Sequence, residues 1–517
     1  MASANLAPFD RTGGTPVDVC LLVEGCYPHV AGGVSTWVDW LIRALPDKRF
    51  AVVSIVAPGE DRRARYVFPD NLLSFQEIEL GGGKGAKLRG RKGASPSPER
   101  LSSALSRFLL GGKLDDLSEV YRQIRAMRLE DLLGGRQSFD LVCGTYRELM
   151  PHGIFEDFFW AWHSLVGGLF CVLKADLPEA RVYHAVSTGY AGLLLARARL
   201  ETQSRTVITE HGIYTNERRI ELLLADWLVD AVDNGYGLVR NRLDIRDLWI
   251  RAFESYARAC YAGADAITTL FADNQPMQSD LGAARDKLRV IPNGIDFERF
   301  AAIPPVPATA PLTVALIGRV VPIKDVKTFV AAVARLADRV PGVKALVAGP
   351  LDEDETYAAE CRALAANLGL EEVLTFTGRV EVTRLLADVH VVVLTSLSEA
   401  QPLTVLEAGA AGRPCVTTNV GACREMLEGA RDENPPLGAG GIVTDILAVN
   451  EIAAAMEALL TDPARRHAAG EALRERVRLN YTTAIAQGRY RDLYSLTPPT
   501  LTPPHREARP WPASVSS

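Results

Sequence analysis

Two carboxylates eight positions apart near the C-terminus have the residue types and spacing of a ligand-binding pair. Glu399 follows the apolar run Val391–Leu394, which predicts a buried parallel strand, and Glu407 lies in the first turns of the helix predicted next. Open α/β sheets bind ligands in loops at the carboxyl ends of their strands. Backbone N–H groups at a helix N-terminus also favour phosphate. The candidate residues are Gln401, Pro402, Leu403 and Thr404. The alternative is an exposed loop acid and a solvated helix acid.

A second motif has two cations at another strand end. The apolar run Leu312–Ile317 is followed by Gly318-Arg319, Lys324 comes five positions after the arginine, and apolar residues at helical spacing begin at Val326. This order predicts that both cations flank a helix N-terminus, beside its dipole. Arginine can hold a diphosphate through two parallel hydrogen bonds, and lysine adds a compact charge. Either residue alone is explained by a surface charge, but together they predict a diphosphate site.

In this order, the Gly-Arg-x4-Lys and Glu-x7-Glu elements resemble the donor half of retaining GT-B glycosyltransferases of the family 4 type. Between them, Phe376–Val380 resembles the loop in which that family holds the nucleotide base, which implies that Arg379 and Val380 contact the base. Val290–Asp296 is similar to the family's interdomain segment. One position departs from the pattern. Ala400 stands where the family usually has glycine, and a positive φ there would be strained.

The N-terminal half narrows the resemblance. Leu22–Trp37 and Thr209–Arg218 are similar to the cytosolic glycosyltransferases of Pel exopolysaccharide synthesis, and the likeness extends over about residues 17 to 495. It implies a UDP-sugar donor, UDP-glucose in the first place, and a growing polysaccharide as acceptor. It also implies partners among the inner-membrane Pel synthesis proteins. An N-acetylhexosamine donor remains open.

Two further candidates lie in these N-terminal segments. Gly32-Gly33 follows the first strand and opens the first helix, so the backbone there can come close to a phosphate; the alternative is an ordinary turn. His211 follows a strand and resembles the family's acceptor-side histidine, with a structural role as the alternative. We expect the phosphate role for the glycines and a functional role for His211.

The resemblance implies a reaction in which a hexosyl unit is transferred with retained configuration and a nucleoside diphosphate departs. Arg319 and Lys324 would stabilise the leaving diphosphate, Glu407 would hold the ribose hydroxyls, and Glu399 would bind the transferred sugar. Two alternatives stay open. A UDP-sugar 2-epimerase on the same fold would need further acid/base carboxylates in the cleft. A non-catalytic nucleotide-sugar-binding scaffold would not need all four residues intact.

One short motif favours a metal. Asp352-Glu353-Asp354 has the Asp-x-Asp spacing with which metal-dependent glycosyltransferases hold a divalent cation. It precedes the predicted helix Tyr357–Leu368, however, and acids are favoured at a helix N-terminus without any metal. We therefore expect no metal site and no cofactor apart from the UDP-sugar substrate, since Arg319 and Lys324 can supply the positive charge.

The elements that must position these residues predict an α/β fold of the GT-B class, with two Rossmann-like domains facing across a cleft. Residues 1–300 are expected to form an acceptor domain with a helical insertion at about 60–180. The linker is 301–311, with four prolines, and the nucleotide-sugar donor domain is 312–480. A helix over 481–495 is expected to cross back to the first domain, and the tail 496–517 to be disordered.

Composition excludes some classes. The 517 residues suffice for two domains, and 48% apolar with 23% charged residues is ordinary for a soluble globular protein. A net charge of -6 argues against a nucleic-acid partner, which would require a basic face. The eight cysteines form no Cys-x-x-Cys pair and predict buried free thiols in a reducing compartment.

We expect a cytoplasmic protein with no direct membrane insertion. Residues 1–16 lack the blocks of a signal peptide, and the apolar stretch 158–173 is too short to span a bilayer. Contact with the inner membrane would then depend on partners. The basic, glycine-rich loop 80–98 and an aromatic run are candidate docking features, with a mobile loop beside a buried helix as the alternative. The run comprises Phe155, Phe158, Phe159, Trp160 and Trp162.

Overall fold

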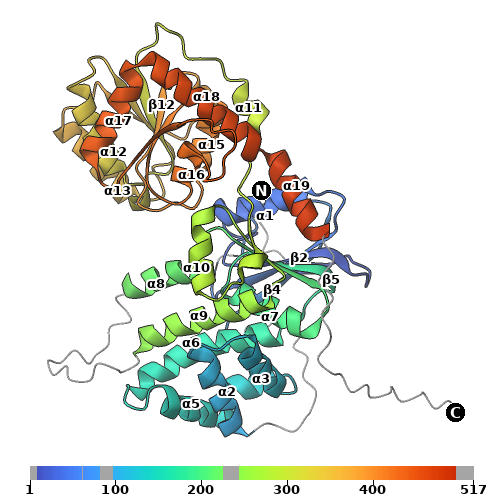
Figure 1. Ribbon diagram of the computed structural model, residues 1–517. Helices are drawn as coiled ribbons and strands as arrows, with labels where there is room; N and C mark the ends of the chain where they lie inside the picture. Colours follow the sequence, from blue (N-terminus) through green and yellow to red (C-terminus); the bar gives the residue numbers. More distant parts are fainter. Residues whose placement is uncertain (1–7, 61, 82–96, 225–243, 496–517) are drawn as a thin grey trace.

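The computed structural model describes residues 8–60, 62–81, 97–224 and 244–495. It confirms the predicted α/β class, because two domains follow one another along the chain and each is built on a mainly parallel sheet (Figure 1). The expected disordered tail, 496–517, and most of the basic loop lie outside the described residues.

The first sheet has eight strands in the order β1-β4-β3-β2-β5-β6-β7-β8. Strand β1 pairs antiparallel with β4 and the other pairings are parallel. The strands are β1 (Phe9–Asp10), β2 (Val17–Glu24), β3 (Phe50–Val56), β4 (Leu72–Glu79), β5 (Ala180–Ala185), β6 (Arg205–Glu210), β7 (Ala266–Thr269) and β8 (Leu288–Val290). The strand order reverses between β2 and β5, and a parallel sheet opens a crevice for ligands at such a point.

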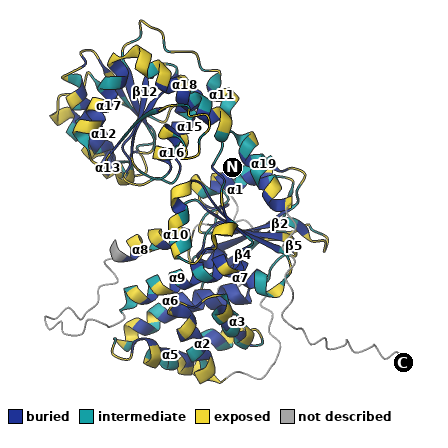
Figure 2. Cartoon of the chain, in the orientation of Figure 1, coloured by how far each residue is buried: buried dark blue, intermediate teal, exposed yellow. Residues whose placement is uncertain are grey.

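The second sheet has six parallel strands in the order β11-β10-β9-β12-β13-β14. They are β9 (Thr313–Ile317), β10 (Lys344–Ala348), β11 (Leu374–Gly378), β12 (Val391–Leu394), β13 (Cys415–Thr418) and β14 (Gly441–Thr444). Central strands such as β12, Val-Val-Val-Leu, are apolar at every position because helices cover both faces of the sheet. Figure 2 shows these strands as the buried interior.

Helices pack on both faces of each sheet. Around the first sheet lie α1 (Gly33–Ala44), α7 (Tyr190–Glu201), α8 (Tyr214–Leu224), α9 (Ile245–Gly263) and α10 (Gln275–Asp280). The second domain contains α11 (Phe297–Ala301), α12 (Val326–Ala337), α13 (Glu355–Asn367), α14 (Val382–Leu386), α15 (Leu403–Ala410), α16 (Cys423–Glu428), α17 (Val449–Thr461) and α18 (Pro463–Asn480). Each sheet separates two buried apolar clusters, one on each face.

The helical insertion is shorter than the range 60–180 expected from the sequence. That range includes β4, which pairs in parallel with β3 and belongs to the sheet. Its polar residues Gln76 and Glu77 obscure the strand pattern in the sequence. The inserted helices are α2 (Pro98–Leu109), α3 (Leu114–Ile124), α4 (Leu129–Leu133), α5 (Gly135–Leu149) and α6 (Phe155–Lys174). They form the end of the first domain farthest from the second (Figure 1).

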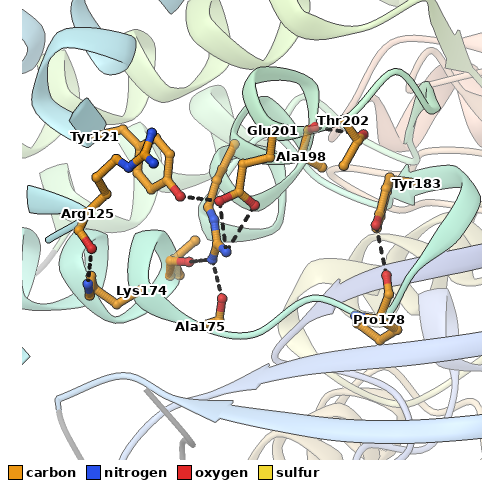
Figure 3. A network of polar contacts seen from close by, with 11 residues as sticks. Tyr121, Arg125, Lys174, Ala175, Pro178, Tyr183, Ala198, Glu201 and Thr202 are labelled. Atoms are coloured by element: carbon orange, nitrogen blue, oxygen red, sulfur yellow. Dashed lines mark hydrogen bonds and ion pairs between the residues drawn. The ribbon is translucent and has the colours of Figure 1, made fainter. Parts of the chain in front are cut away.

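Buried polar contacts attach the insertion to α7 (Figure 3). The Arg197 guanidinium donates to the carbonyl oxygens of Val172 and Ala175, where α6 ends. It also pairs with Glu201, one turn along α7, at 3.1 Å. Tyr121 of α3 donates to the same carboxylate. Because Arg197 is buried, these acceptors satisfy donors that would otherwise be costly to remove from water.

Most side chains of the aromatic run pack into the apolar core of the first domain. Phe158 and Trp162 are fully buried, and Phe155 and Phe159 pack against the same apolar cluster. Trp160 differs, with 64% of its surface exposed. The run therefore does not form one continuous docking surface, since helical spacing turns alternate rings inward.

The chain passes between the domains twice, first at residues 293–296 and again at residues 481–483. We call these segments the two chain crossings, and they lie side by side. Ile295 N–H donates to the Tyr481 carbonyl and Thr483 N–H donates to the Ile295 carbonyl, both at 2.9 Å. A Cβ on Gly294 would lie 2.3 Å from the Thr482 oxygen, so only glycine fits this close approach. After the second crossing, α19 (Thr483–Ser495) returns to the first domain beside α1 (Figure 1).

Helix α19 is held on the first sheet by buried hydrogen bonds that begin at its Tyr494 hydroxyl. The Tyr494 hydroxyl lies 2.7 Å from Nδ1 of His184, whose Nε2 lies 2.7 Å from the Thr209 hydroxyl. All three residues are buried, and burial lowers the pKa of His184 to about 3, so its ring is neutral at pH 7. At the surface of the same helix, Arg491 pairs with Asp47 at 2.9 Å.

All eight cysteines are free, and six of them are buried as predicted, whereas Cys26 and Cys143 are partly exposed. Among the described helices, none is long and apolar enough to cross a membrane.

Tyr494→Phe should lower the free energy of unfolding by about 1–3 kcal/mol, because it leaves a buried imidazole nitrogen without its partner. The matched change Arg491→Ala, in the same helix, should cost less than about 1 kcal/mol, since it breaks an exposed ion pair. Urea unfolding of both variants measures the difference. Equal losses would contradict the role given to the buried contact.

Candidate active site

A cavity of about 600 Å³ lies between the two domains. From the first domain it is lined by residues that follow β2, β5 and β6, and from the second by the loop after β12 and the start of α15. The lining includes five residues predicted from the sequence: Gly33, His211, Glu399, Gln401 and Leu403. We call it the interdomain cavity. It lies at the carboxyl ends of the first sheet's strands, on either side of the point where the strand order reverses.

Glu399 is held in the loop after β12 by two donors. The Ser396 hydroxyl donates to Oε1 at 2.6 Å, and the Lys324 ammonium forms an ion pair with the same oxygen. The carboxylate and ammonium side chains are 13% and 21% exposed, so the pair is largely shielded from water. The two motifs predicted to act together therefore meet through one carboxylate oxygen, although Lys324 is outside the set of residues that line the cavity.

A glycine that sequence reasoning missed supports this loop. A Cβ on Gly421 would lie 2.2 Å from the Glu399 carbonyl oxygen and 2.3 Å from that of Ala400. The next residue, Ala422, donates its N–H to Ala400 at 2.8 Å. Ala400 itself does not adopt a positive φ, so the strain expected for alanine in place of glycine does not arise.

The N-terminus of α15 faces the cavity without a side-chain cap. Pro402 occupies the N-cap position and makes no capping hydrogen bond. Proline has no N–H, so the prediction that Pro402 contributes an amide was wrong, and its carbonyl instead accepts from Val405. The amides of Leu403 and Thr404 begin the helix and carry the positive end of its dipole.

The sequence predicted that Arg319 and Lys324 together flank a helix N-terminus and hold an anion there. In the structure, Arg319 is paired with a protein acid instead. Arg319 pairs with Glu353 at 3.0 Å and is 55% exposed. The amide terminus of α12 is capped by Asp325, whose carboxylate accepts from Thr328 N–H. The negative cap occupies the position where the sequence suggested an anion site. Lys324 remains beside it, on the 3₁₀ turn that precedes the helix.

The base-loop residues Arg379 and Val380 follow β11 and lie outside the lining of the interdomain cavity. Val380 is 41% exposed, and Arg379 pairs with Asp352 at 3.1 Å. The third acid of the Asp-x-Asp segment, Asp354, caps α13 by accepting from Tyr357 N–H at 2.9 Å. Each of the three acids thus has its own protein partner. Within the described ranges, no three His, Cys, Asp or Glu side chains are grouped so as to hold a metal.

Glu407 lies in the second turn of α15 and outside the lining of the cavity. Burial raises the pKa of its carboxyl, while the charge of Arg299 on α11 opposes that shift. Its carboxylate oxygens have no hydrogen-bond partner in the described part of the chain, unlike those of Glu399. They remain available to an external donor.

On the first domain, Gly32 and Gly33 open α1 with φ angles of 91° and 48°. No atom lies within 4 Å of where a side chain would begin on either glycine, so a ligand could approach the backbone closely. His211 lies against Trp37, with ring centroids 4.9 Å apart. Burial lowers the pKa of His211 to about 4, so the ring is neutral at pH 7, and its Nε2 lacks a partner among the described residues.

Two polar residues of the cavity were not assigned a role from the sequence. Asn293, at the domain crossing, donates its N–H to Oε1 of Gln401 at 2.7 Å and so ties the donor loop to the crossing. Glu24 ends β2, where its carboxylate accepts from the Tyr214 hydroxyl at 2.7 Å and from Ala191 N–H at 3.1 Å. The signal available in the sequence for Glu24 was an acid at the end of the apolar strand that precedes the glycine turn.

Comparison with protein-family models divides the chain in two. Residues 17–286 match the model described as Domain of unknown function (DUF3492), which is more than half of the chain. Residues 311–462 match the model described as Glycosyl transferases group 1. The boundary between the two matches lies near the first chain crossing.

Among curated proteins, the glycogen synthase of Mycobacterium tuberculosis is 29% identical over 263 residues, 48% of this chain and 58% of that protein. The GDP-mannose-dependent alpha-(1-6)-phosphatidylinositol monomannoside mannosyltransferase of the same species is 29% identical over 41% of this chain and 57% of that protein. The chain thus spans less than two thirds of the length of these relatives.

Two solved structures resemble the whole chain. Sucrose-phosphate synthase from Thermosynechococcus elongatus has a TM-score of 0.53 at 17% identity and covers 92% of this chain and 98% of its own. HepE of Anabaena, in complex with UDP and glucose, has a TM-score of 0.53 at 14% identity and covers 93% of this chain and 100% of its own. They confirm the predicted GT-B fold, two Rossmann-like domains facing across a cleft.

Proposed function

The chain belongs to the DUF3492 family, and we propose that this domain works with the glycosyl transferases group 1 domain as a retaining glycosyltransferase that uses a UDP-sugar. One observation carries the proposal. Glu399, which pairs with Lys324, and the uncapped N-terminus of α15 lie at the same cavity as Gly33 and His211 of the other domain. A carboxylate and helix amides at the cavity, with a cation paired to that carboxylate, suit the transfer of a sugar from a diphosphate.

The chemistry follows from the charges that develop. As the bond between the anomeric carbon and the phosphate oxygen breaks, negative charge grows on the diphosphate. Lys324 and the amides of Leu403 and Thr404 stabilise it, and preorganised donors of this kind are usually the largest catalytic term. An acceptor hydroxyl attacks the anomeric carbon from the side of departure, and its proton passes to the leaving phosphate oxygen. Configuration is thereby retained, and a glycosidic bond and UDP are formed.

The two domains would divide the binding of the substrates. Glu399 accepts hydrogen bonds from the transferred sugar, and Glu407 accepts them from the ribose. Arg319, Arg379 and Val380 reach the nucleotide once the exposed pairs with Glu353 and Asp352 exchange partners; such pairs are weak and exchange easily. On the first domain, His211 is neutral and can share a hydrogen bond with a sugar hydroxyl without adding charge.

For the substrates, we propose UDP-glucose as donor and a growing exopolysaccharide as acceptor. The support is the resemblance of Leu22–Trp37 and Thr209–Arg218 to PelF, the glycosyltransferase of Pel polysaccharide synthesis. In that role the protein is cytoplasmic and meets the inner membrane through Pel partners. HepE, of similar fold, was crystallised with UDP-glucose, whereas a matched mannosyltransferase depends on GDP-mannose, so the donor has to be measured.

The decisive experiment incubates the purified protein with UDP-glucose and with UDP-N-acetylhexosamines, and measures released UDP with and without oligosaccharide acceptors. Lys324→Ala should lower turnover by about a hundredfold, or about 3 kcal/mol of transition-state stabilisation. Lys327→Ala should leave it unchanged, because Lys327 is exposed on α12 and pairs with Glu360. Normal turnover in Lys324→Ala removes that lysine from the mechanism. A new UDP-sugar formed without UDP release would indicate an epimerase instead.

Substitution of Glu407 and of Glu399 should affect UDP affinity differently, and calorimetric titration with UDP measures this. Glu407→Ala should weaken UDP binding by about tenfold, because the ribose loses its acceptor. Glu399→Ala should keep the affinity for UDP while sugar transfer is lost, since its contacts are to the sugar. Glu428→Ala, at the end of α16, is the control: it removes a surface glutamate of the same domain and should leave UDP affinity unchanged. An equal loss of UDP affinity in the first two variants refutes this division of roles.

Metal removal tests the proposal that positive side chains do the work of a cation. Turnover should be unchanged in excess EDTA and after addition of magnesium or manganese, because Asp352, Glu353 and Asp354 are held by Arg379, Arg319 and the α13 terminus. A large loss in EDTA that manganese restores would show that a metal takes part.

A further inference from the structure

A second cavity, of about 770 Å³, opens beside the interdomain cavity. We call it the insertion cavity. Its floor is formed by residues at the carboxyl ends of three adjacent strands of the first sheet, β2, β3 and β4. Its walls come from α6 of the insertion and from α8 and α9. Ligands of parallel sheets bind at this edge.

The insertion cavity and the interdomain cavity share two residues, Glu24 and Tyr214. The Tyr214 hydroxyl donates a hydrogen bond to the Glu24 carboxylate at 2.7 Å. Gly189 leaves room for both side chains, since a Cβ there would lie 2.6 Å from each of them. The bonded pair thus forms a ridge between the two cavities. A ligand longer than one sugar unit could pass over this ridge with one end in each cavity.

One face of α6 is presented to the insertion cavity. Trp160, His163, Ser164 and Gly167 line it, at the i, i+3, i+4, i+7 spacing of a single helix face. Trp160 is 64% exposed, although every other ring of the aromatic run is at least partly buried. An exposed indole beside a cavity offers a flat apolar face with a polar edge, which suits a ligand that has both characters.

Four more rings continue the lining from Trp160 inward: Tyr190, Tyr214, Trp249 and Phe253. Phe253 holds them together, with ring centroids 5.7 Å from Tyr214 and 5.8 Å from Trp249. The rings are therefore fixed by packing before any ligand binds, which lowers the entropy cost of binding.

The charges of the insertion cavity favour a neutral ligand. Its cation, Arg218, already pairs with Glu221 at 2.7 Å and donates to Tyr214. Glu24 and Glu60 add negative charge, and burial lowers the pKa of His163, so its ring is neutral at pH 7. A second nucleotide or another phosphate would meet net negative charge here. Sugar hydroxyls can both donate to the carboxylates and accept from the guanidinium.

We propose that the insertion cavity binds the acceptor saccharide, holding neutral sugar units that follow the one whose hydroxyl reacts in the interdomain cavity. This rests on the proposed function for its direction, with the reacting end over Glu24 and the older end at Trp160. The insertion then determines which acceptor length is preferred, because a saccharide chain long enough to reach Trp160 binds more tightly than a single sugar.

The test probes an array of immobilised neutral oligosaccharides, hexose and N-acetylhexosamine chains of about one to eight units, with the full-length protein. Wild type should bind chains of about three units or more. Trp160→Ala should weaken that binding by about tenfold or more, the scale of losing one aromatic contact, and Trp160→Phe should restore most of it. Leu110→Ala should bind like wild type, because Leu110 is also exposed on the insertion, at 40%, but is outside the lining.

Thermal unfolding and UDP affinity should be the same in all three variants, because the altered residues are exposed and outside the lining of the interdomain cavity. If no oligosaccharide binds, or Trp160→Ala binds as wild type does, the proposal is overturned, even where UDP-sugar turnover is found. If binding depends on Trp160 but no UDP-sugar is turned over, the saccharide site stands and the proposed function fails.

Discussion

The close contact of the two chain crossings governs the relation between the domains. Backbone hydrogen bonds join Ile295 to Tyr481 and Thr483, and Gly294 lies against Thr482 with no space for a side chain. The contact sets where the second domain leaves the first, and α19 anchors the returning chain through buried tyrosines. Asn293, at the same crossing, bonds directly to Gln401 of the donor loop. The interdomain cavity is thus linked to the crossing through Asn293, and Gly294 of the same crossing also lines it.

At the edge of the interdomain cavity, Glu399 and Lys324 form an ion pair that is largely shielded from water. Removing one member would leave the other poorly compensated, and for that reason a shielded pair is sensitive to truncation. The arginines of the donor domain are different, because Arg319 and Arg379 form exposed pairs that exchange at little cost. Proposed roles in binding a diphosphate and base are compatible with such pairs, since a ligand can replace the protein acids.

The inserted helices change what the first domain can bind without altering its sheet. They are attached by the buried Arg197 contacts and present one face of α6 beside the strand ends. A Rossmann-like sheet has only one crevice at its strand reversal, over β2 and β5. The insertion adds walls over β3 and β4, and a second cavity results beside the first.

The sequence by itself determined most of the elements and which residues stand at their ends. Apolar runs predicted the strands that Glu399 and His211 follow. The two residues belong to different sheets, and both lie at the interdomain cavity because the carboxyl ends of both sheets face it. Strand β4 was missed, since its polar residues break the pattern. The tertiary structure alone decided the partners: that Arg319 meets Glu353, that Asp325 caps α12, and that Tyr494 meets His184, 310 positions away. Local patterns restrict a residue to a face or an end, but which of several acids or rings it contacts depends on how distant elements pack.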